Sequence, residues 1–280
     1  LVERALNAES NASEGAGVPS DAAREAIEAL VDAVHGHART LSLLTSALRQ
    51  DGVTKTHDDL VKLMQEMDKR YPVGSPASRE KSVFASVELS LRRLSPANRD
   101  RARVLGVFHG GVHPAVLCPM MQWEMNDFGA LAVELIQTGL ATPNRYNHLT
   151  LNPALCPYLR GQMDAPEYAE EREALTSRWV AAMRAYVRFL VQQQSQNTEV
   201  AATLTVLELP NLFALLDLVQ RAGDAEATIG LATSLYSLLQ SLGKPRLLER
   251  VGQVRDVAAR QLEKTLGDTW NHARFQASPS

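Results

Sequence analysis

Cysteine is scarce in this sequence, which has only Cys118 and Cys156 among its 280 residues. Two cysteines are too few for the disulfide framework of a small secreted domain. Both lie in apolar runs, where a thiol behaves as a small hydrophobic side chain. We therefore expect a reducing environment and predict a cytoplasmic protein.

The sequence also lacks a positive charge excess and a long uninterrupted apolar run. Its formal net charge is −3, which gives no overall attraction to nucleic acid or to an anionic membrane. The most apolar stretch, residues 200–219, is interrupted by Glu208 and Asn211 and predicts a helix packed against helices, not a membrane span. No signal peptide follows Leu1, so we expect an internal piece of a longer protein.

Motifs of common catalytic centres are absent as well. The sequence contains no G-x-x-x-x-G-K-[ST], G-x-S-x-G, H-E-x-x-H or C-x-x-C. His109, His113 and Cys118 lie close in sequence, but they have irregular spacing and no fourth ligand for zinc. A turn with a buried thiol explains them better. We expect no metal site and no catalysis by this chain alone.

What the sequence does contain is helical periodicity, which predicts three helices in residues 1–70. The first ends at Gly36 and the second runs to about Gly52. The third begins near Thr56, which together with Asp59 resembles a capping box. Residues 71–78, rich in proline, glycine and serine, predict a linker.

Residues 78–165 predict three helices followed by a hairpin, which is the order of a winged-helix domain. Ser95 precedes Pro96, a pair typical of a helix start. A helix over 126–140 is followed by two extended pieces around Pro143 and Asn144, the second over 146–151.

Residues 166–280 predict only helices, over 167–194, 203–221, 225–242 and 245–265. Breaks at 223–224 and 243–245 indicate antiparallel pairs of a TPR-like kind. The predicted fold class is therefore mainly α: a three-helix module, a winged helix with one small β-hairpin, then TPR-like antiparallel helix pairs.

DNA binding is the first function that a winged helix brings to mind, and the composition argues against it. The helix that would enter a groove, 127–138, carries Asp127 and Glu134 and no lysine or arginine. DNA readers need donors for phosphates and base edges. A basic cluster lies elsewhere in the sequence and consists of Arg92, Arg93, Arg99, Arg101 and Arg103. We favour a solvated helix face for it; the alternative is a surface that binds phosphate or an acidic partner.

Four stretches carry a resemblance to a known family. "AIEALVDAVHGHARTLSLL", "SVFASVELSLRRLSPANRDRARVLGVFHGGVHPAVL" and "HLTLNPALCPYLR" resemble, in that order, bacterial STAND signal-transduction ATPases just after their NB-ARC-type nucleotide domain. "ELPNLFALLDLVQRAGDAEATIGLATSLYSLLQSLG" is similar to the helical repeats that follow in many of them. The resemblance implies an ARC-type module in 1–70, ADP or ATP bound only together with an upstream nucleotide-binding domain, and oligomerisation on activation.

The resemblance also implies positions for nucleotide contacts. A turn that lies against adenine in the family corresponds to Gly36, His37 and Ala38, with alanine in place of the family's proline. The alternative is a glycine that only separates two helices. The histidine that reaches a phosphate of ADP in the family is replaced here by Asn152.

Two interpretations of Asn152 remain open. Strand alternation places it on one face with His148 and Thr150. In this interpretation the N–H groups of the helix start and the side chains of Asn152 and His148 would donate to a phosphate. Alternatively, Asn152 only caps a helix that begins with Pro153. We expect Pro157 to mark a bend or a helix end.

The sequence thus predicts a regulatory fragment of a nucleotide-switched ATPase. Its winged helix would clamp ADP, and its repeats would sense a protein or small-molecule signal. The alternatives are a winged-helix transcription regulator with a helical effector domain and a passive TPR-like interaction scaffold.

Overall fold

The computed structural model describes residues 21–34, 38–70 and 80–266. It is mainly helical with a small β-hairpin, which confirms the predicted fold class at that level. The chain forms two compact units. Unit 1 holds the described residues up to Val107 together with 124–144 and 149–169, and unit 2 holds 108–123, 145–148 and the described residues from 170 onward. Neither coincides with a predicted segment (1–70, 78–165 or 166–280), and that division stays a prediction.

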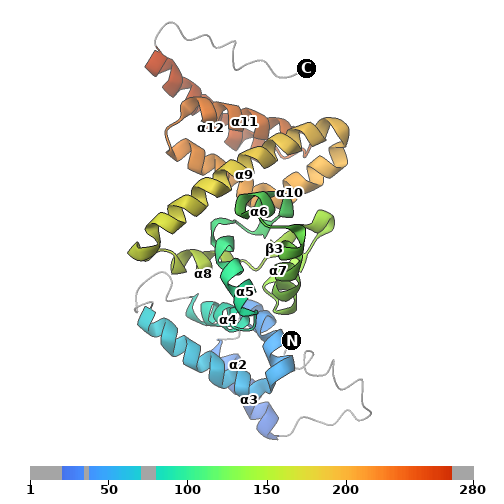
Figure 1. Ribbon diagram of the computed structural model, residues 1–280, viewed down its shortest axis with the longest axis vertical. Helices are drawn as coiled ribbons and strands as arrows, with labels where there is room; N and C mark the ends of the chain where they lie inside the picture. The colour runs from blue at the N-terminus through green and yellow to red at the C-terminus, as the bar shows by residue number, and fades with distance from the viewer. Residues whose placement is uncertain (1–20, 35–37, 71–79, 267–280) are drawn as a thin grey trace. The chain divides into compact units, whose positions relative to one another are not determined.

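Unit 1 begins with α2 (Asp21–Ala33) beside α3 (Ala38–Arg70), as Figure 1 shows. The break predicted near Gly52 is confirmed, because Gly52 adopts φ 76° and ψ 175° and divides α3 into two helical segments. The capping box predicted at Thr56 and Asp59 is wrong. The Thr56 hydroxyl instead donates to the Gly52 carbonyl oxygen, 2.7 Å away, inside the continuing helix.

The next part of unit 1 contains α4 (Lys81–Leu91), α5 (Pro96–Ala102) and the 3₁₀ turn η2 (Arg103–Val107). Ser95 caps α5 as predicted, since its Oγ accepts from the Asn98 N–H at 3.4 Å and Pro96 occupies the first helical position. Apolar residues of α4 alternate with buried serines, and Phe84, Val87 and Leu91 are core residues.

Unit 1 continues with α7 (Met125–Gln137), the strands β2 (Ala141–Pro143) and β3 (Leu149–Leu151), α8 (Leu155–Gln162) and the turn η4 (Pro166–Tyr168). The two strands are antiparallel, with Ala141 opposite Leu151. Leu149 and Leu151 are buried as the alternation predicts. The second strand was expected from Tyr146 but begins at Leu149, because Tyr146 and Asn147 take positive φ values in the turn η3 (Arg145–Asn147).

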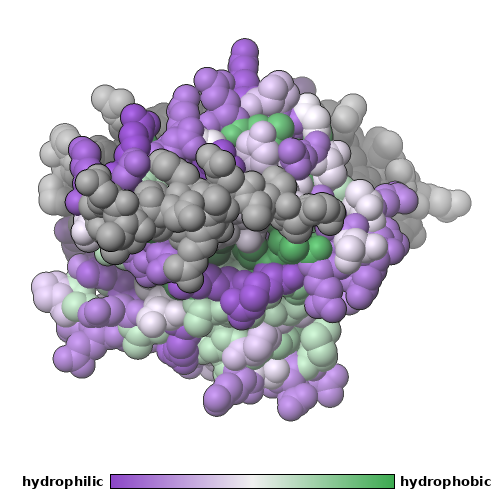
Figure 2. All heavy atoms as spheres, turned by 90° about the horizontal axis from the view of Figure 1, so that it is seen from above, coloured by the Kyte–Doolittle hydropathy of each residue, from purple (hydrophilic) through white to green (hydrophobic). Residues whose placement is uncertain are grey.

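Unit 2 contains the short strand β1 (Gly111–Val112), α6 (Pro114–Met121) and the helices α9 (Ala169–Gln196), α10 (Thr198–Arg221), α11 (Ala225–Gln240) and α12 (Pro245–Leu266). The predicted breaks are confirmed, because Gly223 and Gly243 have positive φ values of 78° and 60°. Figure 1 shows α11 beside α12. Seen from above, most described residues are hydrophilic, with smaller apolar groups between them (Figure 2).

Among the described residues, α10 is the one helix long and apolar enough to cross a membrane by length and composition, and 44% of its most apolar window is buried. A core helix of a soluble protein passes the same test. The finding therefore decides nothing about location, and the predictions of a cytoplasmic protein without a membrane span stay predictions.

Two glycines give a matched test of packing in unit 1. A Cβ at Gly106 would lie 2.6 Å from Met163 Cε, 3.2 Å from Arg160 N and 3.3 Å from the Leu159 carbonyl carbon. A Cβ at Gly129 in α7 would meet no atom of the described residues within 4 Å. Gly106→Ala should destabilise the fold by about 1–3 kcal/mol. Gly129→Ala should stabilise it by about 0.5–1 kcal/mol, because alanine loses less entropy in a helix. Urea denaturation measures both, and equal effects would contradict this packing.

Candidate functional site

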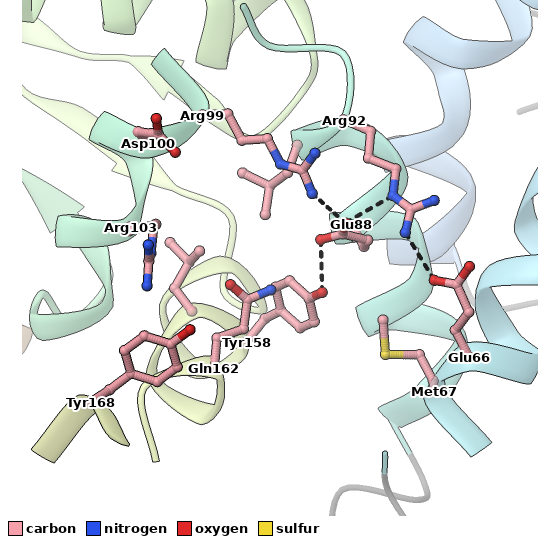
Figure 3. Close-up of a pocket in the computed structure, with 12 residues that line it drawn as sticks. Glu66, Met67, Glu88, Arg92, Arg99, Asp100, Arg103, Tyr158, Gln162 and Tyr168 are labelled. Atoms are coloured by element: carbon pink, nitrogen blue, oxygen red, sulfur yellow. Dashed lines mark hydrogen bonds and ion pairs between the residues drawn. The ribbon is translucent and has the colours of Figure 1, made fainter. Parts of the chain in front are cut away.

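The described part of unit 1 has a pocket of about 480 Å³ beside α3, α4, α5 and α8. Figure 3 shows charged side chains from these elements around it, with Glu88 near the centre. Apolar side chains also line it, among them Leu91 and Leu159. The volume lies within the range of small-molecule sites, about 300–1,000 Å³.

Glu88 connects three helices through its carboxylate. The side chain is 7% exposed, and its Oε1 accepts from Arg92 Nε at 2.9 Å and from Arg99 Nη2 at 2.7 Å. Its Oε2 accepts from the hydroxyl of Tyr158, on α8, at 2.8 Å. Arg92 also donates to Glu66 of α3 at 2.9 Å. A buried carboxylate is tolerated when its lone pairs are satisfied in this way.

The basic cluster is therefore not simply a solvated helix face, which corrects that expectation. Arg92 and Arg99 bind Glu88, and ion pairs of 2.5 Å join Arg93 to Asp51 and Arg101 to Asp127. Arg103 differs from the other four. Its guanidinium lies over the ring of Tyr168, 5.3 Å from the centroid, and has no carboxylate partner among the described residues.

The residues predicted to contact adenine are only partly described. Gly36 and His37 lie outside the described residues, and Ala38 is the first residue of α3. Their proposed nucleotide contact therefore stays a prediction.

Asn152 forms a turn ahead of α8. Its Oδ1 accepts from Ala154 N at 3.0 Å, its carbonyl oxygen accepts from Leu155 N at 2.9 Å, and its own N–H donates to Leu140 O at 2.8 Å. The helix begins at Leu155, so Pro153 precedes it instead of opening it, which corrects that detail. Pro157 lies in the first turn of α8, where no donor is needed, and not at a bend or helix end.

His148 belongs to unit 2, whereas Asn152 belongs to unit 1. The His148 side chain is buried, and its Nε2 lies 3.3 Å from Oε1 of the buried Glu208. This is an ion-pair distance without hydrogen-bond alignment, since neither atom has a hydrogen-bond partner in the described part of the chain. His148 was expected to share a face with Thr150, which is exposed. That expectation is wrong, because the positive φ of Asn147 turns the chain just before the strand.

Glu208 and Asn211 of α10 extend this polar cluster in unit 2. Asn211 Nδ2 donates to Glu208 Oε2 at 2.6 Å and to Gly111 O at 2.9 Å, and its Oδ1 accepts from His109 N at 2.6 Å. One amide therefore joins α10 to the chain around β1. The Asn211 amide is satisfied, whereas Glu208 Oε1, both ring nitrogens of His148 and the Tyr186 hydroxyl have no hydrogen-bond partner among the described residues.

His113 completes the cluster at the start of α6. Its Nδ1 accepts from Ala115 N at 3.1 Å, and its ring lies 5.3 Å from that of Tyr186. Burial lowers the pKa of His113, and the nearby His148 acts in the same direction while Glu208 opposes it. Burial and the Glu208 carboxylate both raise the pKa of Tyr186.

The described residues contain no group of three or more His, Cys, Asp or Glu that could hold a metal ion. His113 serves as a helix cap, and Cys118 is buried in α6. The expectation of no metal site stays a prediction.

Comparison with known proteins adds no identity. No protein-family model, curated protein or solved structure matches the chain. The family resemblance rests on the sequence stretches alone.

Sequence reasoning missed the pocket and its central carboxylate. A signal was available, since Glu88 is the one charged residue inside the apolar run of α4 after Lys81. A carboxylate among buried side chains usually has partners. Tyr158, 70 positions away, is one that local periodicity does not indicate.

Replacing Glu88 tests its role in holding the helices together. Glu88→Gln keeps the size of the side chain but removes the charge that Arg92, Arg99 and Tyr158 share. We expect a loss of about 1.5–3 kcal/mol in the free energy of unfolding, as for hydrogen bonds to charged groups. The exposed Glu173→Gln in α9 is the control, with a change within about 0.5 kcal/mol. Equal chemical-denaturation midpoints for the two variants would contradict this role.

The lowered pKa of His113 predicts a pH dependence of stability. The unfolded chain, with the ordinary histidine pKa near 6.5, takes up this proton before the folded chain does. The contribution of the His113 environment to the free energy of unfolding is therefore complete above pH 6.5 and decreases as the pH falls below it. His113→Asn keeps a capping oxygen but does not titrate. Between pH 7.5 and 5, the free energy of unfolding of this variant should therefore decrease less than that of the wild type. An unchanged pH slope would sink the idea.

Proposed function

We propose that this chain is the regulatory segment of a nucleotide-switched signalling ATPase. The proposal combines the family resemblance, whose stretches occur in the same order as in the family, with one observation on α7. In a DNA-binding winged-helix domain, the corresponding helix would enter a groove of the DNA. Here α7 offers apolar side chains and no cation to a partner.

The acidic side chains of α7 are engaged within unit 1. Glu134 accepts from Ser95 N at 2.8 Å, from Ser95 Oγ at 2.9 Å and from Asn98 Nδ2 at 2.8 Å. Partial burial raises its pKa, but these hydrogen bonds outweigh that effect and the pKa is lowered. Asp127 binds Arg101 and accepts from Glu124 N at 3.1 Å. Neither carboxylate needs a partner from outside, and neither favours DNA.

Apolar side chains occupy the exposed side of α7. Met125 and Val133 are each 53% exposed and Ile136 is 37% exposed, while Phe128, Leu131 and Leu135 are buried on another face. Exposed apolar residues at helical spacing fit a protein surface better than a phosphate backbone. In the proposed function, an upstream nucleotide-binding domain covers them in the ADP-bound state.

The remaining roles are those that the family resemblance implies. ADP or ATP is held mainly by the upstream domain, and the α9–α12 helices bind the protein or small-molecule signal. Signal binding favours the undocked state, which exchanges nucleotide and oligomerises. The chain itself carries out no catalysis.

The first test is the coding sequence upstream of Leu1, where we expect a P-loop within one domain length, about 150–250 residues. In that longer protein, Val133→Glu should speed ADP release about tenfold, as expected when a charge replaces an apolar interface residue. The control is Val257→Glu in α12, a similarly exposed valine. Release of a fluorescent ADP analogue measures both rates.

Other outcomes would select the rival functions. DNA binding with a steep salt dependence would make the chain a transcription regulator. A P-loop found upstream together with unchanged ADP release in Val133→Glu would rule out this docking face. The absence of any P-loop would leave an interaction scaffold.

A further inference from the structure

We propose that the pocket of unit 1 binds a small organic anion through Arg99 and Arg103. The ligand class is a carboxylate or a phosphate monoester with a compact apolar body. This inference does not depend on the proposed function, because it uses only the residues around the pocket.

Arg99 and Arg103 stand four positions apart, across the junction of α5 and η2. Residues at this spacing lie on the same side of a helix, and two like charges there repel each other. Figure 3 shows both side chains at the pocket, Arg99 reaching toward Glu88 and Arg103 beside Tyr168. Arg99 is partly neutralised by Glu88, so the less compensated positive charge at the pocket is that of Arg103, and an anion bound there can form charge-assisted hydrogen bonds with either guanidinium group.

Both arginines retain donors for a ligand. Arg99 contacts Glu88 through one nitrogen, Nη2, and a guanidinium has five N–H donors. Arg103 has no carboxylate partner among the described residues, while the ring of Tyr168 holds its guanidinium in place. An ordered guanidinium loses less entropy when it binds an oxyanion.

The carboxylates at the pocket do not offer an equivalent site for a cation. Both Glu88 oxygens already accept hydrogen bonds, and Glu66 is paired with Arg92. Asp100 is exposed, so water solvates its charge. The unused capacity of the pocket therefore consists mainly of donors. Leu91 and Leu159 line it but are 3% and 2% exposed, so the apolar surface open to a ligand includes the half-buried ring of Tyr168.

Thermal unfolding of the whole chain tests the site with four probes: benzoate, phenyl phosphate, inorganic phosphate and neutral benzyl alcohol. A ligand that binds the folded state raises its melting temperature. We expect benzoate or phenyl phosphate to raise it, and benzyl alcohol to leave it unchanged. Which of the two anions binds more tightly distinguishes a carboxylate ligand from a phosphate ester, and a response to inorganic phosphate alone would contradict the need for an apolar body.

Calorimetric titration of variants locates the binding. Arg103→Gln should weaken the affinity for the better anion roughly tenfold to a hundredfold, and Arg103→Lys should recover part of it. Arg188→Gln removes the same charge from an exposed position of α9 and should change nothing. Circular dichroism confirms that each variant is folded.

Three results would overturn the site. They are no response to any anion, equal binding by wild type and Arg103→Gln, and stabilisation by benzyl alcohol as large as that by benzoate.

Discussion

A single buried carboxylate, that of Glu88, constrains the arrangement of unit 1. Moving a carboxylate out of water costs several kcal/mol, and the cost is offset only where donors reach both oxygens. Here the donors come from Arg92 at the end of α4, from α5 and from α8, so these helices must meet at one place. The same side chains form a wall of the pocket. Stability and any binding in this pocket therefore depend on shared groups.

Much of the fold could be predicted because it depends on local rules. The spacing of apolar residues indicated the helices, and the glycines at positions 52, 223 and 243 indicated breaks between them. Each of these glycines does adopt a positive φ, a conformation that favours glycine. The errors have a common origin. Tyr146 and Asn147 adopt the left-handed conformation without being glycine, and Thr56 bonds back to its own helix. Such choices depend on surrounding contacts that a local pattern does not contain.

Less of the candidate sites could be predicted, because their partners are distant in sequence. Glu88 and Tyr158 are 70 positions apart, and Asn211 meets Gly111 across 100. The sequence showed Glu208 and Asn211 only as polar interruptions of an apolar stretch, although both are buried bonding groups. Strand alternation predicted that His148 and Asn152 share one face. In the structure the side chain of His148 lies beside Glu208, whereas that of Asn152 accepts a hydrogen bond from Ala154 N.

The chain passes from one compact unit to the other five times, at 107–108, 123–124, 144–145, 148–149 and 169–170. A single cut therefore cannot yield two complete units, and a fragment ending at residue 165 would carry residues 108–123 away from α9–α12. Such a truncation would separate Phe108 from Trp179, whose ring centroids lie 6.3 Å apart, and would expose both core side chains to water. Point substitutions within one unit leave all of its segments in place and are therefore the better way to study the units separately.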